Sequence, residues 1–493
     1  MKAIQINPQL EDLDNPETFL NHIQELTKNP TTPHSDILHQ LILQFEPLDF
    51  EEMANPHNAE NFKLNNKHYT VLSIEEIIQI AESNRWGLCK NHNFIYLFNG
   101  TYWDELDKET FQKFLGMAAE KMGVPTFSAR YYRFRKELYE QFLGTAYIEP
   151  KPLLANRVLI NLKNGTFEIS PTGTQLRAFD RSDFLTYQLP FEYNPQAKAP
   201  LFEAYLNQVL PDIERQKVLA EYLGFVFIKH GSNRLKEEKA LILYGTGANG
   251  KSVFFEIVSA LLGAKNTSNY SLQSLTNENG YFRAKLANKL VNYASEINGK
   301  LESATFKQLV SGEPVEARLP YGEPFTLRQY AKLIFNCNEL PKDVEHTNAY
   351  FRRFLIIPFD VTIPPQDQDK QLHAKIIESE LSGVFNWVLD GLNRLLEQKR
   401  FTDCEAVRKA VEQYKTQSDS VKLFIEEHNY KSNPSDFRLI KELYIEYRTF
   451  CIEDGFKPVN KSNFMKRLSG FGFLIERINI GNVAYLSNHQ NPF

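Results

Sequence analysis

The sequence has little cysteine, and its few thiols are far apart. Only four cysteines occur in 493 residues, namely Cys89, Cys337, Cys404 and Cys451. None belongs to a CxxC pair or has the spacing of a His/Cys metal set. This spacing favours isolated reduced thiols over the alternative, a structural zinc site.

Long hydrophobic runs, internal repeats and low-complexity tracts are also missing. No stretch approaches the roughly 20 apolar residues that a membrane-spanning helix requires. The residues after Met1–Ile4 are polar and acidic, unlike the apolar centre of a signal peptide. With 42% hydrophobic and 24% charged residues, the composition is that of a globular protein. We therefore expect a cytoplasmic chain of about three domains, with no membrane partner.

The net charge of -5 hides an uneven distribution. Residues 1–60 contain eleven acidic and two basic side chains, a local net charge of -9, so the remaining 433 residues sum to +4. A modestly positive body permits nucleic-acid binding without demonstrating it.

The pattern of elements predicts four segments. These are an acidic N-terminal arm (1–74), an α+β domain (75–199), an α/β nucleotide-binding domain with helical flanks (200–417) and a small C-terminal unit (418–493). We expect the arm to be peripheral and partly flexible, with one short helix at Ser35–Phe45.

The α+β domain is expected to begin with a hairpin at residues 94–103. Asn99-Gly100 has the composition of a type I′ turn, which requires two residues with positive φ. A second hairpin is expected around Asn164-Gly165, and helices at about 108–122 and 128–143.

A complete phosphate-binding loop follows the buried-strand pattern at Ala240–Tyr244. It matches G-x-x-x-x-G-K-[ST], and an amphipathic helix follows it. The glycines let backbone N–H groups surround phosphate oxygens, and the helix N-terminus adds positive potential. Lys251 is expected to reach the β and γ phosphates of ATP, and Ser252 to hold Mg²⁺. The loop comprises Gly245, Thr246, Gly247, Ala248, Asn249, Gly250, Lys251 and Ser252.

Two later strand patterns end in candidate catalytic residues. Residues 290–296 end in Glu296, which we expect to orient the attacking water and to help hold the metal. Enzymes with this phosphate loop usually have an aspartate just before the glutamate, but here the residue is Ser295. Which group holds the second shell of Mg²⁺ therefore stays open. Residues 332–338 end in Asn338, which is suited to hydrogen-bond the γ-phosphate. The alternatives are an exposed loop glutamate and a turn-forming asparagine.

Two adjacent arginines precede the apolar strand pattern at residues 354–359. An arginine about 100 residues after a phosphate loop can reach the γ-phosphate of a neighbouring subunit and stabilise transition-state charge. We favour Arg353 for this role, with Arg352 close behind; a structural salt bridge is the alternative.

In this order the motifs resemble the superfamily 3 helicases of the phage and plasmid primase–helicase family, which are related to poxvirus-type primase-helicases. The resemblance covers roughly residues 75–493. It rests on YLFNGTYW, INLKNGTFEI, GTGANGKS, the Glu296 strand, Phe306–Glu313, KLIFNCNELP, FRRFLIIPF and Leu381–Trp387.

The resemblance implies an AAA+-type core that assembles into a ring, usually a hexamer, around one DNA strand. It also implies a DNA-gripping hairpin, here residues 315–327, with Arg318 and Tyr321 as the plausible contacts. A solvated surface strand is the alternative for Arg318. Many relatives have an upstream primase domain; Asp12 and Asp14 have the bare D-x-D spacing, but an acidic arm of about 70 residues is too short for that fold. We therefore expect no primase activity here, and a separate primase or polymerase as a further partner.

The last 75 residues have the element order of a winged helix. Helices are expected at 419–427, 438–453 and 460–469, followed by strands at 472–477 and 482–487. The third helix carries Lys461, Lys466 and Arg467 and no acidic residue. It could enter the major groove of duplex DNA, or serve as a basic helix for protein contacts.

Residues 130–136 interleave basic and aromatic side chains. This composition suits a phosphate backbone with stacked bases. It is also typical of an amphipathic helix that buries its aromatic residues, and we favour that interpretation.

The leading hypothesis is a replicative, ring-forming DNA helicase of a phage, plasmid or mobile element, using ATP and Mg²⁺. The main alternative is an initiator or loader that uses ATP only as an assembly switch. A small-molecule kinase with the same phosphate loop is weaker, and DNA-stimulated ATP hydrolysis would count against it.

Overall fold

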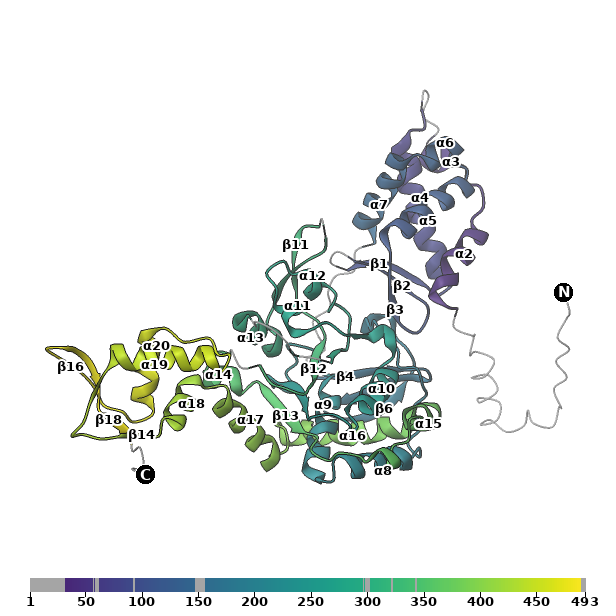
Figure 1. Ribbon diagram of the computed structural model, residues 1–493. Helices are drawn as coiled ribbons and strands as arrows, with labels where there is room; N and C mark the ends of the chain where they lie inside the picture. Colours follow the sequence, from purple (N-terminus) through teal and green to yellow (C-terminus); the bar gives the residue numbers. More distant parts are fainter. Residues whose placement is uncertain are drawn as a thin grey trace. The chain divides into compact units, whose positions relative to one another are not determined.

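The computed structural model describes residues 32–55, 57, 62–91, 94–146, 156–295, 297, 302–320, 322–341 and 344–488. The chain divides into two compact units (Figure 1). Unit 1 comprises Met1–Pro152, Gly165–Phe167 and Leu176–Gln188, and unit 2 comprises Leu153–Asn164, Glu168–Gln175 and Leu189–Phe493. No helix in these described ranges combines the length and apolarity needed to cross a lipid bilayer.

Unit 1 packs helices against a small antiparallel sheet. The sheet has the order β1-β2-β3, formed by Gly87–Asn91, Phe94–Phe98 and Trp103–Leu106. The helices are α2 (His34–Gln44), α3 (Phe50–Ala54), α4 (Asn66–Ser83), α5 (Lys108–Lys121), α6 (Thr126–Arg130) and α7 (Tyr132–Thr145). The predicted helix at 108–122 is confirmed as α5, whereas the one at 128–143 is divided between α6 and α7.

The first helices of unit 1 are part of its core, so the expectation of a peripheral arm is wrong for residues 34–54. Ile37, Leu41 and Phe50 are buried in the same cluster as Ile74 and Phe114. Ile37 and Leu41 are four residues apart and form one apolar face, which is stable only when packed against other helices. The expected boundary at residue 74 lies inside α4, and residues 1–31 are outside the described part.

The hairpin between β2 and β3 is confirmed, but its turn differs from the prediction. Gly100 has φ 98°, whereas Asn99 has no positive φ, so the connection is not a type I′ turn. Instead the Asn99 Oδ1 atom accepts hydrogen bonds from the backbone N–H groups of Thr101 (3.0 Å) and Tyr102 (3.1 Å). The asparagine side chain thus stabilises a longer, side-chain-capped loop.

Residues 158–183 hold the second predicted hairpin. Strands β4 (Val158–Leu162), β5 (Gly165–Ser170) and β6 (Gly173–Arg177) form a sheet in that order, followed by the short helix η2 (Arg181–Asp183). Within unit 1, Trp103 Nε1 donates to the Arg181 carbonyl (2.9 Å).

Unit 2 is built on a parallel sheet with the order β13-β7-β12-β9-β8. Its strands are β7 (Ala240–Tyr244), β8 (Thr267–Ser268), β9 (Val291–Ala294), β12 (Lys332–Cys337) and β13 (Phe354–Pro358). The four longer strands are almost entirely buried, as expected when helices cover both faces of a parallel sheet. This architecture confirms a mixed α/β fold and places each of the strands that the sequence predicted around the phosphate loop.

Helices surround this sheet. They are α8 (Pro200–Val209), α9 (Ile213–Phe225), α10 (Lys251–Leu262), α11 (Leu272–Thr276), α12 (Tyr281–Ala284), α13 (Ser303–Ser311), α14 (Asn348–Phe351), α15 (Leu372–Ser379), α16 (Leu381–Gln398) and α17 (Glu405–Gln417). The pair α9 and α16 is held by the buried carboxylate of Glu221, which accepts from Arg394 Nε (2.6 Å) and the Thr402 backbone (2.8 Å). The hydrogen bonds from Arg394 and Thr402 compensate the Glu221 carboxylate for the hydration that it loses on burial.

Two further parts of unit 2 match predicted elements. The hairpin of β10 (Val315–Arg318) and β11 (Pro324–Leu327) is antiparallel. The C-terminal part has helices α18 (Ser420–Glu427), α19 (Ile440–Glu453) and α20 (Lys461–Gly470). Its strands β15 (Arg438–Leu439), β17 (Gly481–Ala484) and β16 (Ile475–Ile478) form one sheet in that order, and β14 (Tyr430–Ser432) pairs with β18 (Leu486–Asn488).

A buried lysine lies at the first residue of β12. The Lys332 Nζ atom is 3.0 Å from His230 Nδ1 and 4.2 Å from the centre of the Phe225 ring. His230 Nε2 lies 3.1 Å from the Tyr330 carbonyl, which fixes Nδ1 as the acceptor for Lys332. Burial lowers the pKa of Lys332 to about 7 and, with Lys332 beside it, lowers the pKa of His230 well below its usual value.

We expect Lys332 to make stability depend on pH near neutrality. In the unfolded chain this lysine stays protonated to its ordinary pKa, whereas the folded chain releases the proton near pH 7. The unfolded state therefore binds more protons above pH 7, so the free energy of unfolding rises with pH. Between pH 6.5 and 8.5 the native chain should gain about 1–2 kcal/mol relative to Lys332→Met. Chemical denaturation at several pH values measures this; parallel pH profiles of the two proteins would contradict it.

Candidate nucleotide-binding site

The phosphate loop lies at the carboxyl end of β7 and leads directly into α10. Its backbone has positive φ at Gly247 (117°), Ala248 (48°) and Gly250 (86°). The turn is tied to the end of β12 and to the segment after β13, because the Gly245 N–H donates to the Cys337 carbonyl (3.1 Å) and the Ile363 N–H to the Ala248 carbonyl (2.8 Å). The loop therefore has a shape that most L-residues adopt only with strain.

Glycine is required at Gly250 by both its positive φ and the lack of space, and at Gly247 by its positive φ alone. A Cβ atom at Gly250 would lie 2.6 Å from Val209 Cγ1, in addition to the unfavourable φ. At Gly247 nothing lies within 4 Å of the place where a Cβ would be, so this part of the loop is open. The open side is where the backbone can approach phosphate oxygens.

Lys251 is the first residue of α10, and its side chain is held inside the loop. Its Nζ atom donates to the Gly245 carbonyl (2.6 Å) and to Asn249 Oδ1 (2.9 Å). Burial lowers the pKa of Lys251. The ammonium is thus positioned next to the backbone that would surround a phosphate group.

The loop residues fit a Mg²⁺-bound nucleoside triphosphate. The N-terminus of α10 has no side-chain cap, so its first N–H groups can bind an anion. Ser252 is exposed beside them and offers a hydroxyl oxygen. Clusters of three or more His, Cys, Asp or Glu side chains suited to a metal do not occur in the described residues. Ser252 would hold Mg²⁺, whereas Glu296, the other predicted metal residue, lies outside the described residues.

Sequence patterns did not indicate what braces the loop. The Asn249 side chain is buried, and its Nδ2 donates to the Phe359 carbonyl (2.8 Å), just after β13. Tyr205 of α8 donates its hydroxyl proton to the Gly250 carbonyl (2.8 Å). The Asn249 side chain thus stabilises the loop, and its backbone N–H group stays available to bind phosphate.

Asn338 is exposed and follows β12, the neighbour of β7. Cys337 pairs in register with Tyr244, so the chain places Asn338 beside the start of the phosphate loop. Asn336 instead lies inside the sheet, where its Oδ1 accepts from the Tyr293 hydroxyl (2.9 Å). Residues i and i+2 of a strand share a face, so alternation does not separate the two asparagines; Asn338 differs because it lies just after the end of β12.

Glu296 is outside the described residues. Strand β9 ends at Ala294, and the exposed Ser295 follows at the same edge of the sheet as Asn338. The catalytic and metal roles of Glu296 therefore remain predictions.

The two arginines lie at the opposite edge of the sheet, between α14 and the amino end of β13. The side chain of Arg353 is only 8% exposed and that of Arg352 is 62% exposed. Arg353 donates to Ser311 Oγ (2.9 Å) and to the Ala349 carbonyl, so it fastens α13 and α14 to the sheet. Arg352, although paired with Glu238, is thus the more accessible of the two arginines, and the finger role stays a prediction for either.

Glu238, which sequence patterns did not single out, links both arginines. Its Oε2 atom is 3.1 Å from the nearest guanidinium nitrogen of Arg352 and 3.1 Å from that of Arg353. The adjacent Lys239 donates through Nζ to the Arg352 carbonyl (2.6 Å). Glu238 and Lys239 directly precede β7, so the segment that leads to the phosphate loop also holds the arginine pair.

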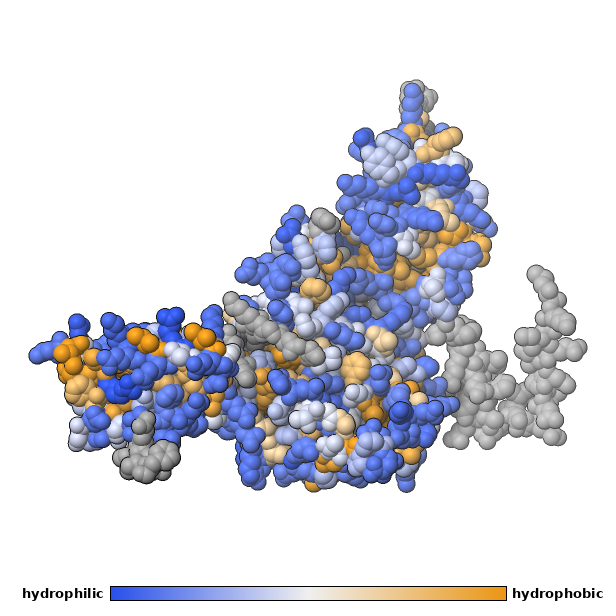
Figure 2. All heavy atoms as spheres, viewed as in Figure 1, coloured by the Kyte–Doolittle hydropathy of each residue, from blue (hydrophilic) through white to orange (hydrophobic). Residues whose placement is uncertain are grey.

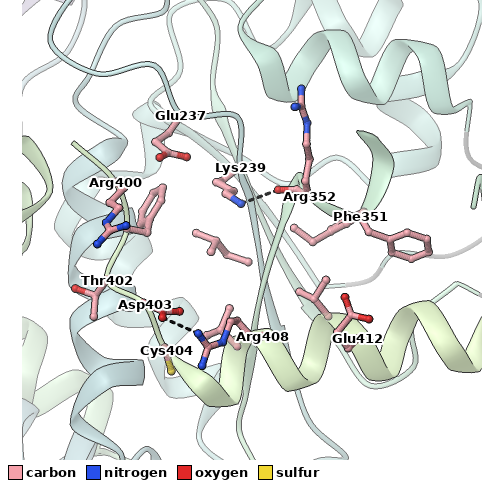
Figure 3. Close-up of a pocket in the computed structure, with 15 residues that line it drawn as sticks. Glu237, Lys239, Phe351, Arg352, Arg400, Thr402, Asp403, Cys404, Arg408 and Glu412 are labelled. Carbon is pink, nitrogen blue, oxygen red and sulfur yellow. Dashed lines mark hydrogen bonds and ion pairs between the residues drawn. The ribbon is translucent and has the colours of Figure 1, made fainter. Parts of the chain in front are cut away.

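A cavity of about 470 Å³ opens beside this segment. Figure 3 shows Lys239 bonded to the backbone of Arg352, while the Arg352 side chain extends away from the other labelled residues. The cavity is at the amino edge of β7 and β13 and is therefore separate from the phosphate loop. It is lined by Glu237, Lys239, Phe351, Arg352, Phe354, Leu355, Arg400, Phe401, Thr402, Asp403, Cys404, Val407, Arg408, Val411 and Glu412.

The predicted DNA contacts differ in accessibility. Arg318 is exposed at the end of β10, where its Nε donates to the Gly322 carbonyl (2.8 Å) near the hairpin tip. Tyr321 is outside the described residues. Lys461 and Lys466 are exposed on α20.

Arg467 is the exception on α20. Its Nη1 atom lies 3.2 Å from Asp419 Oδ1, the carboxylate that also caps α18. Arg467 is therefore engaged within unit 2, a long-range contact that argues against the expected role in DNA binding.

Two family models match the chain. One, described as D5 N terminal like, matches residues 79–211, and the other, a family of unknown function (DUF5906), matches residues 243–353. The second range contains the phosphate loop, β9, β12 and both arginines.

Two viral proteins are similar in sequence. "Putative helicase 121R" of Invertebrate iridescent virus 3 is 24% identical over 336 residues, which is 60% of this chain and 35% of that protein. "Putative helicase L207/L206" of Acanthamoeba polyphaga mimivirus is 25% identical over 211 residues, which is 41% of this chain and 22% of that protein. The chain thus spans about a third of the first relative and about a fifth of the second.

Solved structures of the NrS-1 C-terminal region also align with the chain. Two A-form apo structures cover 83% and 85% of this chain and 98% and 100% of their own, with 13% identity and TM-scores of 0.46 and 0.47.

A phosphate-binding loop between a buried parallel strand and a helix, in a five-stranded parallel sheet of the described residues, defines an NTPase-like α/β protein. The D5 N-terminal-like segment and the helicase-named relatives agree with the resemblance that the ordered motifs indicate. The chain is similar to superfamily 3 helicases of the primase–helicase type.

Proposed function

We propose that the chain is an ATP-dependent DNA helicase that forms a ring, usually a hexamer, and acts in replication of a phage, plasmid or other mobile element. One observation carries this proposal: the phosphate loop and Asn338 share one edge of the sheet, and Arg352 lies at the other. Helicase-named relatives support a helicase-like role in replication.

The position of Arg352 favours action between subunits. The two edges of the sheet are separated by the length of β13. Its five residues span about 15 Å, at roughly 3.3 Å per residue. The guanidinium of Arg352 therefore cannot easily reach its own phosphate loop, but it can contact the loop of an adjacent copy. In a ring of identical subunits, each copy would offer its arginine to one neighbour and its loop to the other.

Each residue then has a distinct task. Lys251 and the loop N–H groups bind the β and γ phosphates, and Asn338 hydrogen-bonds the γ-phosphate. Glu296 orients the attacking water, and the neighbour's Arg352 stabilises the charge that develops on the γ-phosphate oxygens. Mg²⁺, held through Ser252, neutralises charge on the phosphates when bound.

We further propose an AAA+-type core, and a C-terminal winged helix that contacts duplex DNA through Lys461 and Lys466. The strand order of the sheet supports the first assignment. The second is supported by three helices followed by the paired strands β16 and β17. In such a ring, the hairpin that carries Arg318 would contact the single DNA strand in the central channel.

Strand separation on a forked duplex tests the proposal directly. Purified chain with ATP and Mg²⁺ should displace the labelled strand, whereas ADP should support no displacement. ATP-dependent DNA binding without any displacement would reject the helicase assignment.

That second outcome is what an ATP-switched initiator or loader would give, and one contact favours this alternative. His346, in the loop that follows Asn338, lies with Nε2 2.6 Å from the Ser418 carbonyl and Nδ1 3.7 Å from the Asp419 carboxylate. A loop that responds to the γ-phosphate could thus change the position of the C-terminal helices.

Arg318 provides a separate test of DNA engagement. We expect Arg318→Ala to weaken single-stranded DNA binding about five- to ten-fold, because one phosphate contact per subunit is lost. Fluorescence anisotropy with labelled oligodeoxythymidine at several salt concentrations measures this loss. Arg328→Ala is the matched control, since Arg328 is exposed just beyond the other strand of the hairpin. Equal affinity of the two variants would remove Arg318 from the DNA contact.

A further inference from the structure

The segment from α6 to the start of α7 exposes aromatic rings that packing in unit 1 does not explain. Phe127 is 91% exposed, Tyr131 49% and Tyr132 59%. Among the described residues of unit 1, no other Phe, Tyr or Trp is an exposed large hydrophobic side chain. Leaving such rings in water forgoes the gain from burial, so their clustering at one place calls for a function.

The same segment is anchored firmly below these rings. Ala129, Phe134 and Leu138 are buried in the unit 1 core. Phe134 thus satisfies the expectation of an amphipathic helix that buries its aromatic residues, whereas Tyr131 and Tyr132 contradict it. Because the backbone is fixed by the buried side chains, the exposed rings are presented on a rigid support.

Positive charge surrounds the rings. Between Lys121 and Lys136 the sequence has no Asp or Glu, and it has Arg130, Arg133 and Arg135. In the described part of the chain, Arg133 and Lys136 have no carboxylate within ion-pair distance, while Arg130 is bound by Glu120 at 2.7 Å. The next carboxylates, Glu137 and Glu140, follow further along α7.

The rings and cations are in contact with each other. The Tyr131 and Tyr132 ring centres are 5.1 Å apart at 72°, and the Arg133 guanidinium carbon lies 5.8 Å from the centre of the Tyr132 ring. Arg133 Nε also donates to the Tyr132 hydroxyl oxygen (3.0 Å). In Figure 2, apolar atoms interrupt the hydrophilic surface around the position of α6.

We propose that one surface of unit 1, here termed the α6–α7 patch, binds single-stranded nucleic acid. The patch comprises Phe127, Arg130, Tyr131, Tyr132, Arg133 and Lys136. Exposed rings offer faces on which successive bases stack, and the cations attract the phosphate backbone. Duplex DNA is less suited, because its bases are already stacked on each other. The patch belongs to unit 1 and so adds a site beyond the hairpin and the C-terminal helix of unit 2.

The test compares full-length variants without nucleotide, so that ATP hydrolysis has no influence on the result. Labelled oligodeoxythymidine is titrated with native chain, Tyr131→Ala/Tyr132→Ala and Tyr131→Phe/Tyr132→Phe. We expect the alanine variant to lose about ten-fold or more in affinity, and the phenylalanine variant to keep it because its rings still stack. Leu43→Ala is the control for removing an exposed apolar side chain from the same unit.

Further readouts distinguish direct contact with the nucleic acid from loss of folding. Arg133→Glu should weaken binding and reduce its dependence on salt concentration. Native and variant proteins should unfold at the same temperature, because the altered side chains are exposed. Photo-crosslinking of an iodouracil-substituted oligonucleotide should label the peptide that contains residues 127–133.

Several results would overturn the proposal. Unchanged affinity of the alanine variant, with normal binding by the native chain, would reject the patch while leaving the helicase assignment intact. Unchanged DNA affinity together with an altered oligomeric mass would identify the patch as a protein interface. Absence of any single-stranded DNA binding by native chain would reject both the patch and the proposed function.

Discussion

Replacing Lys251 by alanine is expected to reduce ATP turnover by at least about 10²–10³-fold. The loop holds its ammonium inside the turn, 2.6 Å from the Gly245 carbonyl oxygen, where we expect the β and γ phosphates to bind. Without it, the charge on the transferred phosphoryl group would depend on backbone N–H groups, Mg²⁺ and the neighbour's arginine. Steady-state phosphate release with saturating ATP measures the loss.

A control separates this chemistry from folding. Lys370→Ala removes an exposed lysine from the same unit and should turn over ATP at the native rate. Thermal unfolding of Lys251→Ala should show whether the loop variant remains folded. A folded Lys251→Ala protein with native turnover would show that this loop does not form the catalytic site.

Arg352→Ala is expected to have the second large effect, a loss of about a thousand-fold in turnover, as for other arginines that act on a phosphoryl transition state. Arg353→Ala should behave differently. Because Arg353 is buried with Ser311 and Glu238 as partners, its loss should destabilise the fold by about 2–4 kcal/mol. Phosphate release and thermal unfolding, measured side by side, distinguish the catalytic arginine from the structural one.

Mixing two inactive variants tests whether Arg352 acts between subunits. A Lys251→Ala subunit still carries Arg352, and an Arg352→Ala subunit still carries an intact phosphate loop. In a randomly mixed ring about a quarter of the interfaces would combine the two intact halves, so activity should partly return. If exchanging subunits stayed inactive at every ratio, or if Arg353→Ala alone abolished turnover without unfolding, the assignment of Arg352 would be wrong.

The phosphate loop and its strands were predictable because their signals are local. Consecutive residues from Gly245 to Ser252 define the loop, and mostly apolar runs define β7, β12 and β13. Such features need only the neighbouring residues to be known.

The errors arise where distant residues determine the outcome. The sequence predicts positive φ for Asn99, but its side chain instead bonds the backbone of Tyr102. The same reasoning places the helix that contains Ile37 in a peripheral arm, because nothing in its local sequence shows the helices against which it packs.

Charged residues show the same limit. The sequence favours Arg353 over Arg352 and counts Arg467 among the DNA contacts. Their partners Glu238 and Asp419 lie 115 and 48 positions away in the sequence, and a linear pattern cannot reveal such pairs.

We propose that ATP is cleaved between two copies of this chain and that DNA controls the cleavage. The most direct measurement is ATP turnover per subunit over a wide range of protein concentration, with and without single-stranded DNA. We predict a rate that rises steeply as subunits associate and rises further when DNA is added. A constant rate from the isolated subunit, unaffected by DNA, would contradict this account.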